Sequence, residues 1–106
     1  MSSSTAIILT TAGSQDEAGR IAHAIVEARL AACVNIIPQV RSIYRWQGKI
    51  DEATEWLLLI KSAASNFSRI REAIQALHSY ELPECIMVEI NEGSGKYLDW
   101  LLENSR

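Results

Sequence analysis

The chain has 106 residues, of which 48% are hydrophobic and 22% are charged, and its formal net charge is −3 at pH 7. This length and composition fit one domain over residues 1–106, able to bury roughly two-thirds of its unfolded surface. Lysines and arginines are scattered, which excludes the basic footprint typical of nucleic-acid or anionic-membrane binding. No apolar stretch of the sequence is long enough to cross a bilayer, so we expect neither a nucleic-acid nor a membrane partner.

Residues 1–5 (MSSST) are small and polar, and we expect them to be disordered. They have neither the basic start nor the long apolar stretch of a secretory signal, so they favour a cytoplasmic protein. Cys33 and Cys85 are the only cysteines. In that compartment we expect them to be reduced thiols with a small-hydrophobe role, not a disulfide.

The first quarter of the chain predicts a strand followed by a helix. Residues 6–11 form a short apolar run that suits a buried strand. Ser14 and Glu17 are three residues apart and predict a capping box, which opens a helix. The buried stripe of that helix is predicted by apolar residues at helical spacing: Ala18, Ile21, Ala22, Ile25 and Ala28.

Two long strand-like runs follow, over residues 34–46 and 49–62. The first would extend to ~43 Å, whereas a domain of this size has a radius of gyration of only about 13 Å. Pro38 lacks a backbone donor and should lie at an edge, at a bulge or where one strand segment passes to another. Because apolar residues continue beyond it, we expect a hairpin that projects from its own domain and is covered by other subunits.

The loop of this hairpin can be predicted from parity, because apolar residues of both runs fall mainly at even positions. A two-residue loop would pair even positions with odd ones and would set Tyr44 against Asp51. A three-residue loop keeps apolar residues opposite apolar residues. We therefore expect the loop Trp46-Gln47-Gly48, with Gly48 in the left-handed conformation of a G1 bulge.

The second half predicts a helix, a strand and a final helix. Apolar spacing indicates an amphipathic helix that ends near His78, residues 85–90 indicate a fourth strand, and residues 97–102 a short helix. This order matches the ferredoxin-like βαββαβ arrangement, an α+β fold with two helices on one face of an antiparallel sheet. In that order the second and fourth strands are at opposite edges, so Cys33 and Cys85 should not meet.

Four segments, in order and spacing, resemble the CutA divalent-cation tolerance proteins: ARLAACVNIIP (28–38), SIYRWQGKI (42–50), HSYELPE (78–84) and YLDWL (97–101). The resemblance covers almost the whole chain from about Ile7. It implies a ferredoxin-like subunit, a tight homotrimer built through the long hairpins, a cytoplasmic location and a link to copper and other divalent ions. The family is also similar to trimeric PII-type signalling proteins, a likeness of fold and assembly that does not determine function.

A metal site is the sharpest hypothesis from the residues. His78, Glu81, Glu84 and Cys85 lie within eight residues and offer ligands that copper(II), copper(I) and zinc accept. The resemblance implies that His78 and Glu84 are the metal ligands. Some relatives also have a Cys near position 10; this chain has Thr10 there and so lacks that thiolate. A histidine at a helix end also interacts with the C-terminal dipole, so that structural interpretation stays open beside the ligand one.

A second interpretation uses a cleft between subunits. Tyr80 and Glu81, next to Arg45 and Lys61 of the hairpin, would line a cleft for a small ligand. No GxSxG, HExxH or Ser-His-Asp pattern occurs, and two histidines without a convincing nucleophile favour a protein that is not an enzyme and has no organic cofactor. The sequence thus predicts a cytoplasmic homotrimer that binds copper(II) or another divalent metal ion in metal tolerance or homeostasis. The alternative is a PII-like trimeric signalling module that senses a small molecule in its intersubunit clefts.

Overall fold

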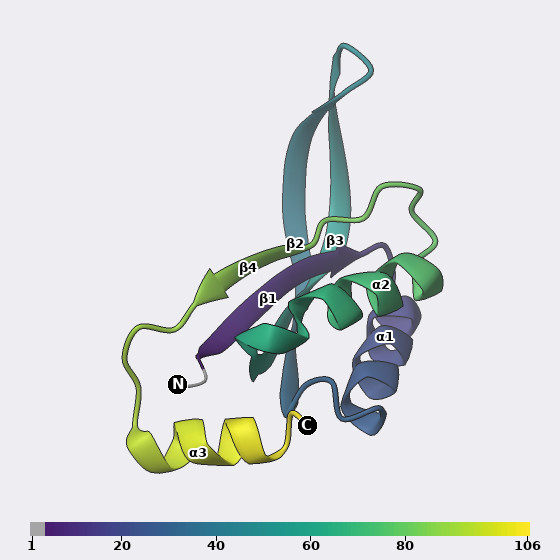
Figure 1. Cartoon of the computed structure of the whole chain (residues 1–106). Helices are drawn as coiled ribbons and strands as arrows, with labels where there is room; N and C mark the ends of the chain where they lie inside the picture. The colour runs from purple at the N-terminus through teal and green to yellow at the C-terminus, as the bar shows by residue number, and fades with distance from the viewer. Residues whose placement is uncertain (1–3) are drawn as a thin grey trace.

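The computed structural model describes residues 4–106 and contains a four-stranded sheet of order β2-β3-β1-β4, in which every pairing is antiparallel. The elements are β1 (Thr5–Ala12), α1 (Gln15–Glu27), β2 (Cys33–Trp46), β3 (Lys49–Ala63), a 3₁₀ turn η1 (Ala64–Asn66), α2 (Phe67–Leu77), β4 (Ile86–Glu89) and α3 (Gly95–Glu103). Helices α1 and α2 cover one face of the sheet, and α3 packs at one end (Figure 1). The predicted α+β ferredoxin-like fold is confirmed.

The N-terminal strand begins earlier than expected. Thr5 belongs to β1 and is buried, so the predicted disordered tip does not reach this residue. Residues 1–3 lie outside the described part of the chain. Among residues 4–106, no helix combines the length and apolar character that a membrane crossing needs.

The core lies between the two helices and the even-numbered residues of the central strands. Ile8 of β1 and Leu58 of β3 are fully buried, as are Ile21 of α1 and Ile70 of α2. Each such side chain contributes about 1.5–3 kcal/mol through burial. The predicted apolar stripes of both helices contact the sheet except at their C-terminal ends, where Ala28 follows α1 and is exposed and Leu77 of α2 is 46% exposed.

The opposite face of the sheet is also apolar, although neither α1 nor α2 covers it. We call it the open face; it is formed by Ile7, Leu9, Ile37, Leu57, Leu59, Ile86 and Val88. Ile86 and Val88 of the edge strand β4 are 52% and 54% exposed. The face of an antiparallel sheet that meets water is normally polar, so this face is suited to contact with another chain.

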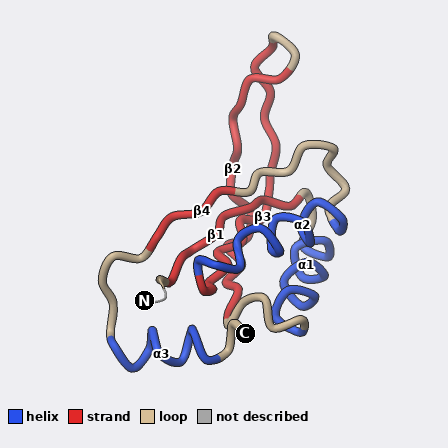
Figure 2. Tube along the Cα trace, in the orientation of Figure 1, coloured by secondary structure: helices blue, strands red, loops and turns tan. Residues whose placement is uncertain are grey.

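The β2–β3 hairpin projects far beyond the helices, as the sequence predicted (Figures 1 and 2). The molecule measures 45 × 25 × 22 Å along its principal axes. Near the tip, Ile43 and Ile50 are 60% and 63% exposed. The hairpin therefore carries apolar surface that its own chain leaves uncovered.

A β-bulge divides this hairpin into two registers. In the inner part, Ile36 pairs with Leu58, so even positions face even positions. Pro38 and Gln39 then lie opposite the single residue Trp56, and Gln39 has a positive φ of 58°. One of the locations predicted for Pro38, a bulge, is confirmed. Because the bulge adds one residue to β2, the parity of pairing changes beyond it.

The predicted loop of the hairpin is wrong. Trp46 pairs with Lys49 and Tyr44 with Asp51, so the connection is the two-residue turn Gln47-Gly48 and even positions pair with odd ones in the outer hairpin. Both turn residues have positive φ, 49° and 79°, as a type I′ turn requires. The prediction assumed one register along the whole hairpin, but none of the helices within residues 4–106 packs on its outer part to enforce apolar pairing (Figure 1). The positive φ of Gly48 is confirmed.

The turn generates a stability prediction. Gly48→Ala should lower the free energy of unfolding by roughly 1 kcal/mol, because a Cβ is disfavoured at a φ of 79°. Denaturant unfolding measures the difference. Gly19→Ala is the matched control, since its added Cβ meets nothing within 4 Å and Ala favours the α1 interior. Equal destabilisation by both substitutions would contradict the turn geometry.

Candidate functional site

The shifted register of the outer hairpin gathers aromatic and acidic residues on one face. Cross-strand partners share a face, so Tyr44 of β2 lies beside Asp51 of β3. With the segment that follows α2, they line a cavity of roughly 620 Å³, which we call the acidic cleft. Its lining consists of Thr11, Ser42, Ile43, Tyr44, Trp46, Asp51, Glu55, Tyr80, Glu81, Leu82 and Glu84. These lining residues include four carboxylates and neither lysine nor arginine, so the cleft favours positive ligands.

Tyr80, Glu55 and Glu84 dominate the electrostatics of the cleft. The Tyr80 hydroxyl donates a hydrogen bond to Glu55 Oε2 at 2.8 Å, and Glu55 is buried. Burial, together with the bond and the charge of Glu55, raises the pKa of Tyr80 above its usual range, so the phenol remains a donor. Partial burial and then the charge of Glu55 raise the pKa of Glu84. A cation in the cleft would relieve this repulsion between carboxylates.

His78 lies behind the cleft, and both of its ring nitrogens have hydrogen-bond partners. Nε2 is 2.6 Å from the carbonyl oxygen of Thr11, which can only accept, so Nε2 carries the hydrogen. The backbone N–H of Tyr80 donates to Nδ1 at 3.0 Å. The side chain is fully buried. To bind a metal ion, His78 would have to lose one of these hydrogen bonds, so its role as a ligand stays a prediction. In the structure His78 connects the end of α2 to β1 through its bond to Thr11.

Glu17 connects the start of α1 to the segment after α2. Ser14 Oγ accepts a hydrogen bond from the Glu17 N–H at 3.1 Å, which confirms the Ser14 half of the capping box. The Glu17 carboxylate accepts instead from the N–H groups of Ser79, at 2.7 Å, and Gly13, at 3.4 Å. Burial acts to raise the pKa of Glu17, but the Ser79 and Gly13 hydrogen bonds and nearby His78 outweigh it and lower that pKa.

The structure brings together only part of the predicted ligand cleft. Tyr80 and Glu81 line the acidic cleft, as does the predicted metal ligand Glu84. Arg45 pairs with Ile50 in the outer hairpin and does not line it. Lys61 lies in the body of β3, with Nζ 5.9 Å from the centre of the Tyr97 ring. A role for Arg45 and Lys61 in a cleft between subunits stays a prediction.

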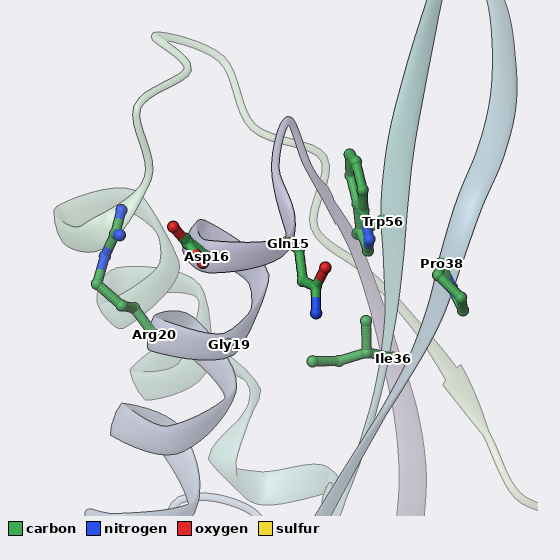
Figure 3. Close-up of a pocket in the computed structure, with 7 residues that line it drawn as sticks. All are labelled: Gln15, Asp16, Gly19, Arg20, Ile36, Pro38 and Trp56. Carbon is green, nitrogen blue, oxygen red and sulfur yellow. The ribbon is translucent and has the colours of Figure 1, made fainter.

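A second cavity, of roughly 470 Å³, lies between α1 and the hairpin near the bulge. Figure 3 shows Gln15, Ile36 and Trp56 between the helix and the strands. Its lining consists of Gln15, Asp16, Gly19, Arg20, Ile36, Pro38 and Trp56. None of the site residues predicted from the sequence contributes to it, and its single acid and single arginine give no charge preference. The acidic cleft is therefore the stronger candidate.

A family model described as CutA1 divalent ion tolerance protein matches residues 6–104, nearly the whole chain. The chain belongs to this family. The divalent-cation tolerance protein CutA of Thermus thermophilus is 50% identical over 99 residues, which cover 93% of this chain and 96% of that protein. A solved structure of the divalent cation tolerance protein (Cut A1) from Thermus thermophilus matches with a TM-score of 0.94 at 48% identity, covering 96% of this chain and 99% of that chain.

Two other CutA relatives differ in location or in length. The solved structure of a periplasmic divalent cation tolerance protein CutA from Archaeoglobus fulgidus has a TM-score of 0.93 at 39% identity, covering 96% of this chain and 99% of its own. The chloroplastic Protein CutA of Arabidopsis thaliana is 39% identical over 100 residues, which cover 94% of this chain. The present chain spans about half the length of that plant relative, 55%.

The thiol positions considered for CutA-type metal binding lie outside the acidic cleft. Cys33 in the edge strand β2 and Cys85 just before the opposite edge strand β4 are both free, as predicted. Partial burial raises the pKa of the Cys85 thiol. Thr10 is fully buried on the helix-covered side of the sheet, and within the described residues its hydroxyl has no hydrogen-bond partner. Over residues 4–106, no three His, Cys, Asp or Glu side chains converge into a group that could hold a metal ion.

The residues that sequence analysis missed are Asp51, Glu55 and Glu17. Glu55 stands immediately before the apolar run of β3, and Asp51 was considered only as an unfavourable partner for Tyr44 in the choice of loop. A carboxylate buried within a strand needs a hydrogen-bond donor or a cation, so the place of Glu55 in the strand could have marked it as a candidate site residue. Glu17 was assigned to the capping box, and the spacing of residues in the sequence gave no indication of its hydrogen bond to the Ser79 N–H.

Glu17 generates a pH prediction. Glu17→Gln should lower the free energy of unfolding at neutral pH by roughly 1–3 kcal/mol, since hydrogen bonds to a charged acceptor are lost. The folded-state pKa lies below the usual 4.5, so the carboxylate's contribution is fully present above pH 4.5 and is lost as pH falls through the folded pKa. Urea unfolding at several pH values should show the two proteins converging in acid. A difference that stays constant with pH would contradict the role of the charge.

Proposed function

We propose that this protein is a cytoplasmic homotrimer that binds a divalent cation in its acidic cleft and contributes to divalent cation tolerance without catalysing a reaction. The single observation that carries the proposal is the cleft itself. Four carboxylates line it without a lysine or arginine among the lining residues, and exposed Ile43 of the outer hairpin belongs to the same lining. Family membership supplies the link to divalent cations.

The cation-binding part of the proposal rests on Glu55, Glu81 and Glu84. Carboxylate oxygens are good ligands for divalent ions, and Cu²⁺ binds a given ligand set more tightly than the neighbouring first-row ions. Repulsion between Glu55 and Glu84 favours a cation between them. Because the carboxylates of one chain do not converge into a closed group within residues 4–106, water or a second copy must complete the shell. Binding should therefore be modest and reversible.

The assembly part rests on the open face and the outer hairpin. The exposed side chains of Ile86 and Val88 continue the apolar surface of Ile7 and Leu9, their partners across the sheet. Exposed apolar patches of this kind mark protein contacts. A second and third copy of the same chain would cover the open face and the hairpin together, because both surfaces recur in every copy.

The cytoplasmic location is a separate part of the proposal and does not depend on the cation site. The Archaeoglobus fulgidus relative is described as periplasmic and the Arabidopsis thaliana relative as chloroplastic, so family membership alone does not determine the compartment. Fractionation of cells that express the native gene tests the location directly. Recovery in a membrane or periplasmic fraction would contradict it.

Light scattering tests the assembly. The wild-type protein should have three times the 11.8 kDa mass of the chain at micromolar concentration. Val88→Lys should yield smaller species, because it places a charge on the open face. Val26→Lys is the matched control on the outer side of α1, where the valine is 40% exposed, and it should leave the trimer intact. A stable folded wild-type monomer would overturn the proposal.

Calorimetric titration with Cu²⁺ tests the cation site. The double change Glu81→Gln with Glu84→Gln should lower the affinity by on the order of tenfold or more, because both residues line the cleft. The matched control is Glu72→Gln with Glu92→Gln, two exposed glutamates outside the cleft, which should bind like wild type. If the Glu81 and Glu84 variant binds normally, the site lies elsewhere, with His78 and the cysteines as the next positions to change.

A small-molecule function is the second candidate, and the size of the cleft favours it. A volume of roughly 620 Å³ exceeds what one ion needs, and Tyr44, Trp46 and Tyr80 provide aromatic walls. Aromatic faces next to carboxylates attract organic ammonium groups. The function would then be that of a PII-like sensor. Titration with spermidine and with Cu²⁺ separates the two candidates: saturable binding of spermidine alone would favour the sensor.

A further inference from the structure

Gly13, between β1 and α1, lies directly against the ring of Tyr80. A Cβ added at Gly13 would come 3.0 Å from the Tyr80 hydroxyl oxygen and 3.5 Å from Cε1. Contacts of 3.0 Å are shorter than those that carbon and oxygen atoms normally make. The tyrosine therefore occupies space that any side chain at position 13 would take.

The backbone on both sides of this contact is held by buried polar groups. Glu17 accepts hydrogen bonds from the N–H groups of Gly13 and Ser79, so one carboxylate joins the loop before α1 to the segment after α2. His78 accepts from the Tyr80 N–H, and its ring centre is 4.5 Å from that of Tyr80. Glu17 and His78 are both buried and have little room to move. Their contacts therefore restrict the position of the Tyr80 ring on the side away from the cleft.

We propose that Gly13 is a positioning residue for the acidic cleft, because its lack of a side chain lets Tyr80 stand where its hydroxyl orients Glu55. This inference rests on the proposed cation-binding function. The hydroxyl donates to Oε2 of Glu55 at 2.8 Å and leaves Oε1 available to a cation. A carboxylate that is already oriented loses less freedom when it binds, so affinity depends on the partner that holds it.

The proposal makes Gly13 and Tyr80 energetically coupled. Gly13→Ala would push the hydroxyl from its place and disturb the bond to Glu55. Tyr80→Phe removes the hydroxyl and also removes the atom nearest to a new Cβ, which leaves only contacts of 3.5 Å and more. In the Tyr80→Phe background, Gly13→Ala therefore has nothing left to displace. A general effect of the alanine on the loop would instead persist in both backgrounds.

A double-mutant cycle with Cu²⁺ as the probe tests the coupling. Four proteins are titrated by calorimetry: wild type, Gly13→Ala, Tyr80→Phe and the double variant. We expect each single change to weaken Cu²⁺ binding about tenfold and the double variant to bind no more weakly than Tyr80→Phe alone. Gly19→Ala, whose Cβ meets nothing within 4 Å, serves as the control and should bind like wild type. Thermal unfolding of all five proteins establishes that each is folded.

The outcomes separate this inference from the proposed function. Wild-type affinity in Gly13→Ala, or a double variant weakened by the product of the two single effects, would overturn the positioning role and leave the cation site standing. An unfolded Gly13→Ala protein that Tyr80→Phe restores to the fold and to the Tyr80→Phe affinity would support it. Absence of Cu²⁺ binding by the wild type would overturn the proposed function and this inference with it.

Discussion

The extra residue that β2 inserts at Pro38 and Gln39 is the constraint on which the rest of the structure depends. A strand alternates its faces strictly, so a hairpin with one register must keep the same parity from end to end. The bulge removes that requirement. The inner register pairs Ile36 with the fully buried Leu58, and the outer register places Tyr44 beside Asp51 on the cleft side.

The acidic cleft forms where the outer hairpin meets the segment after α2. Carboxylates are costly to bury, and the chain reduces that cost by giving them donors: Tyr80 for Glu55, and backbone N–H groups for Glu17. Glu84 has no such donor among the hydrogen bonds of the described residues, and its raised pKa reflects partial burial and the charge of Glu55. The acids of the cleft thus come from β3 and from the segment after α2, and that segment also supplies the Tyr80 hydroxyl that supports Glu55.

The apolar surfaces and the cleft are parts of the same arrangement. The open face reaches the exposed edge strand β4, and the outer hairpin carries exposed Ile43 and Ile50 close to the lining of the cleft. Any chain that covers these surfaces would also approach the acidic residues. Assembly and ligand binding should therefore influence each other, since burial of the rim would exclude water and strengthen the electrostatic interactions inside.

Local patterns in the sequence determined the α+β order, the helices, the cap at Ser14, the projecting hairpin and the positive φ of Gly48, because each depends on residues close together in the chain. Short segments of the sequence likewise indicated the family. The register was decided only in three dimensions, since it depends on a bulge whose effect accumulates along two strands. Tertiary structure alone also decided that Glu55 meets Tyr80, that Glu17 reaches Ser79, and that both ring nitrogens of His78 are occupied. Apart from the local bond between His78 and the Tyr80 N–H, these contacts join residues far apart in sequence, and residue spacing gives no information about them.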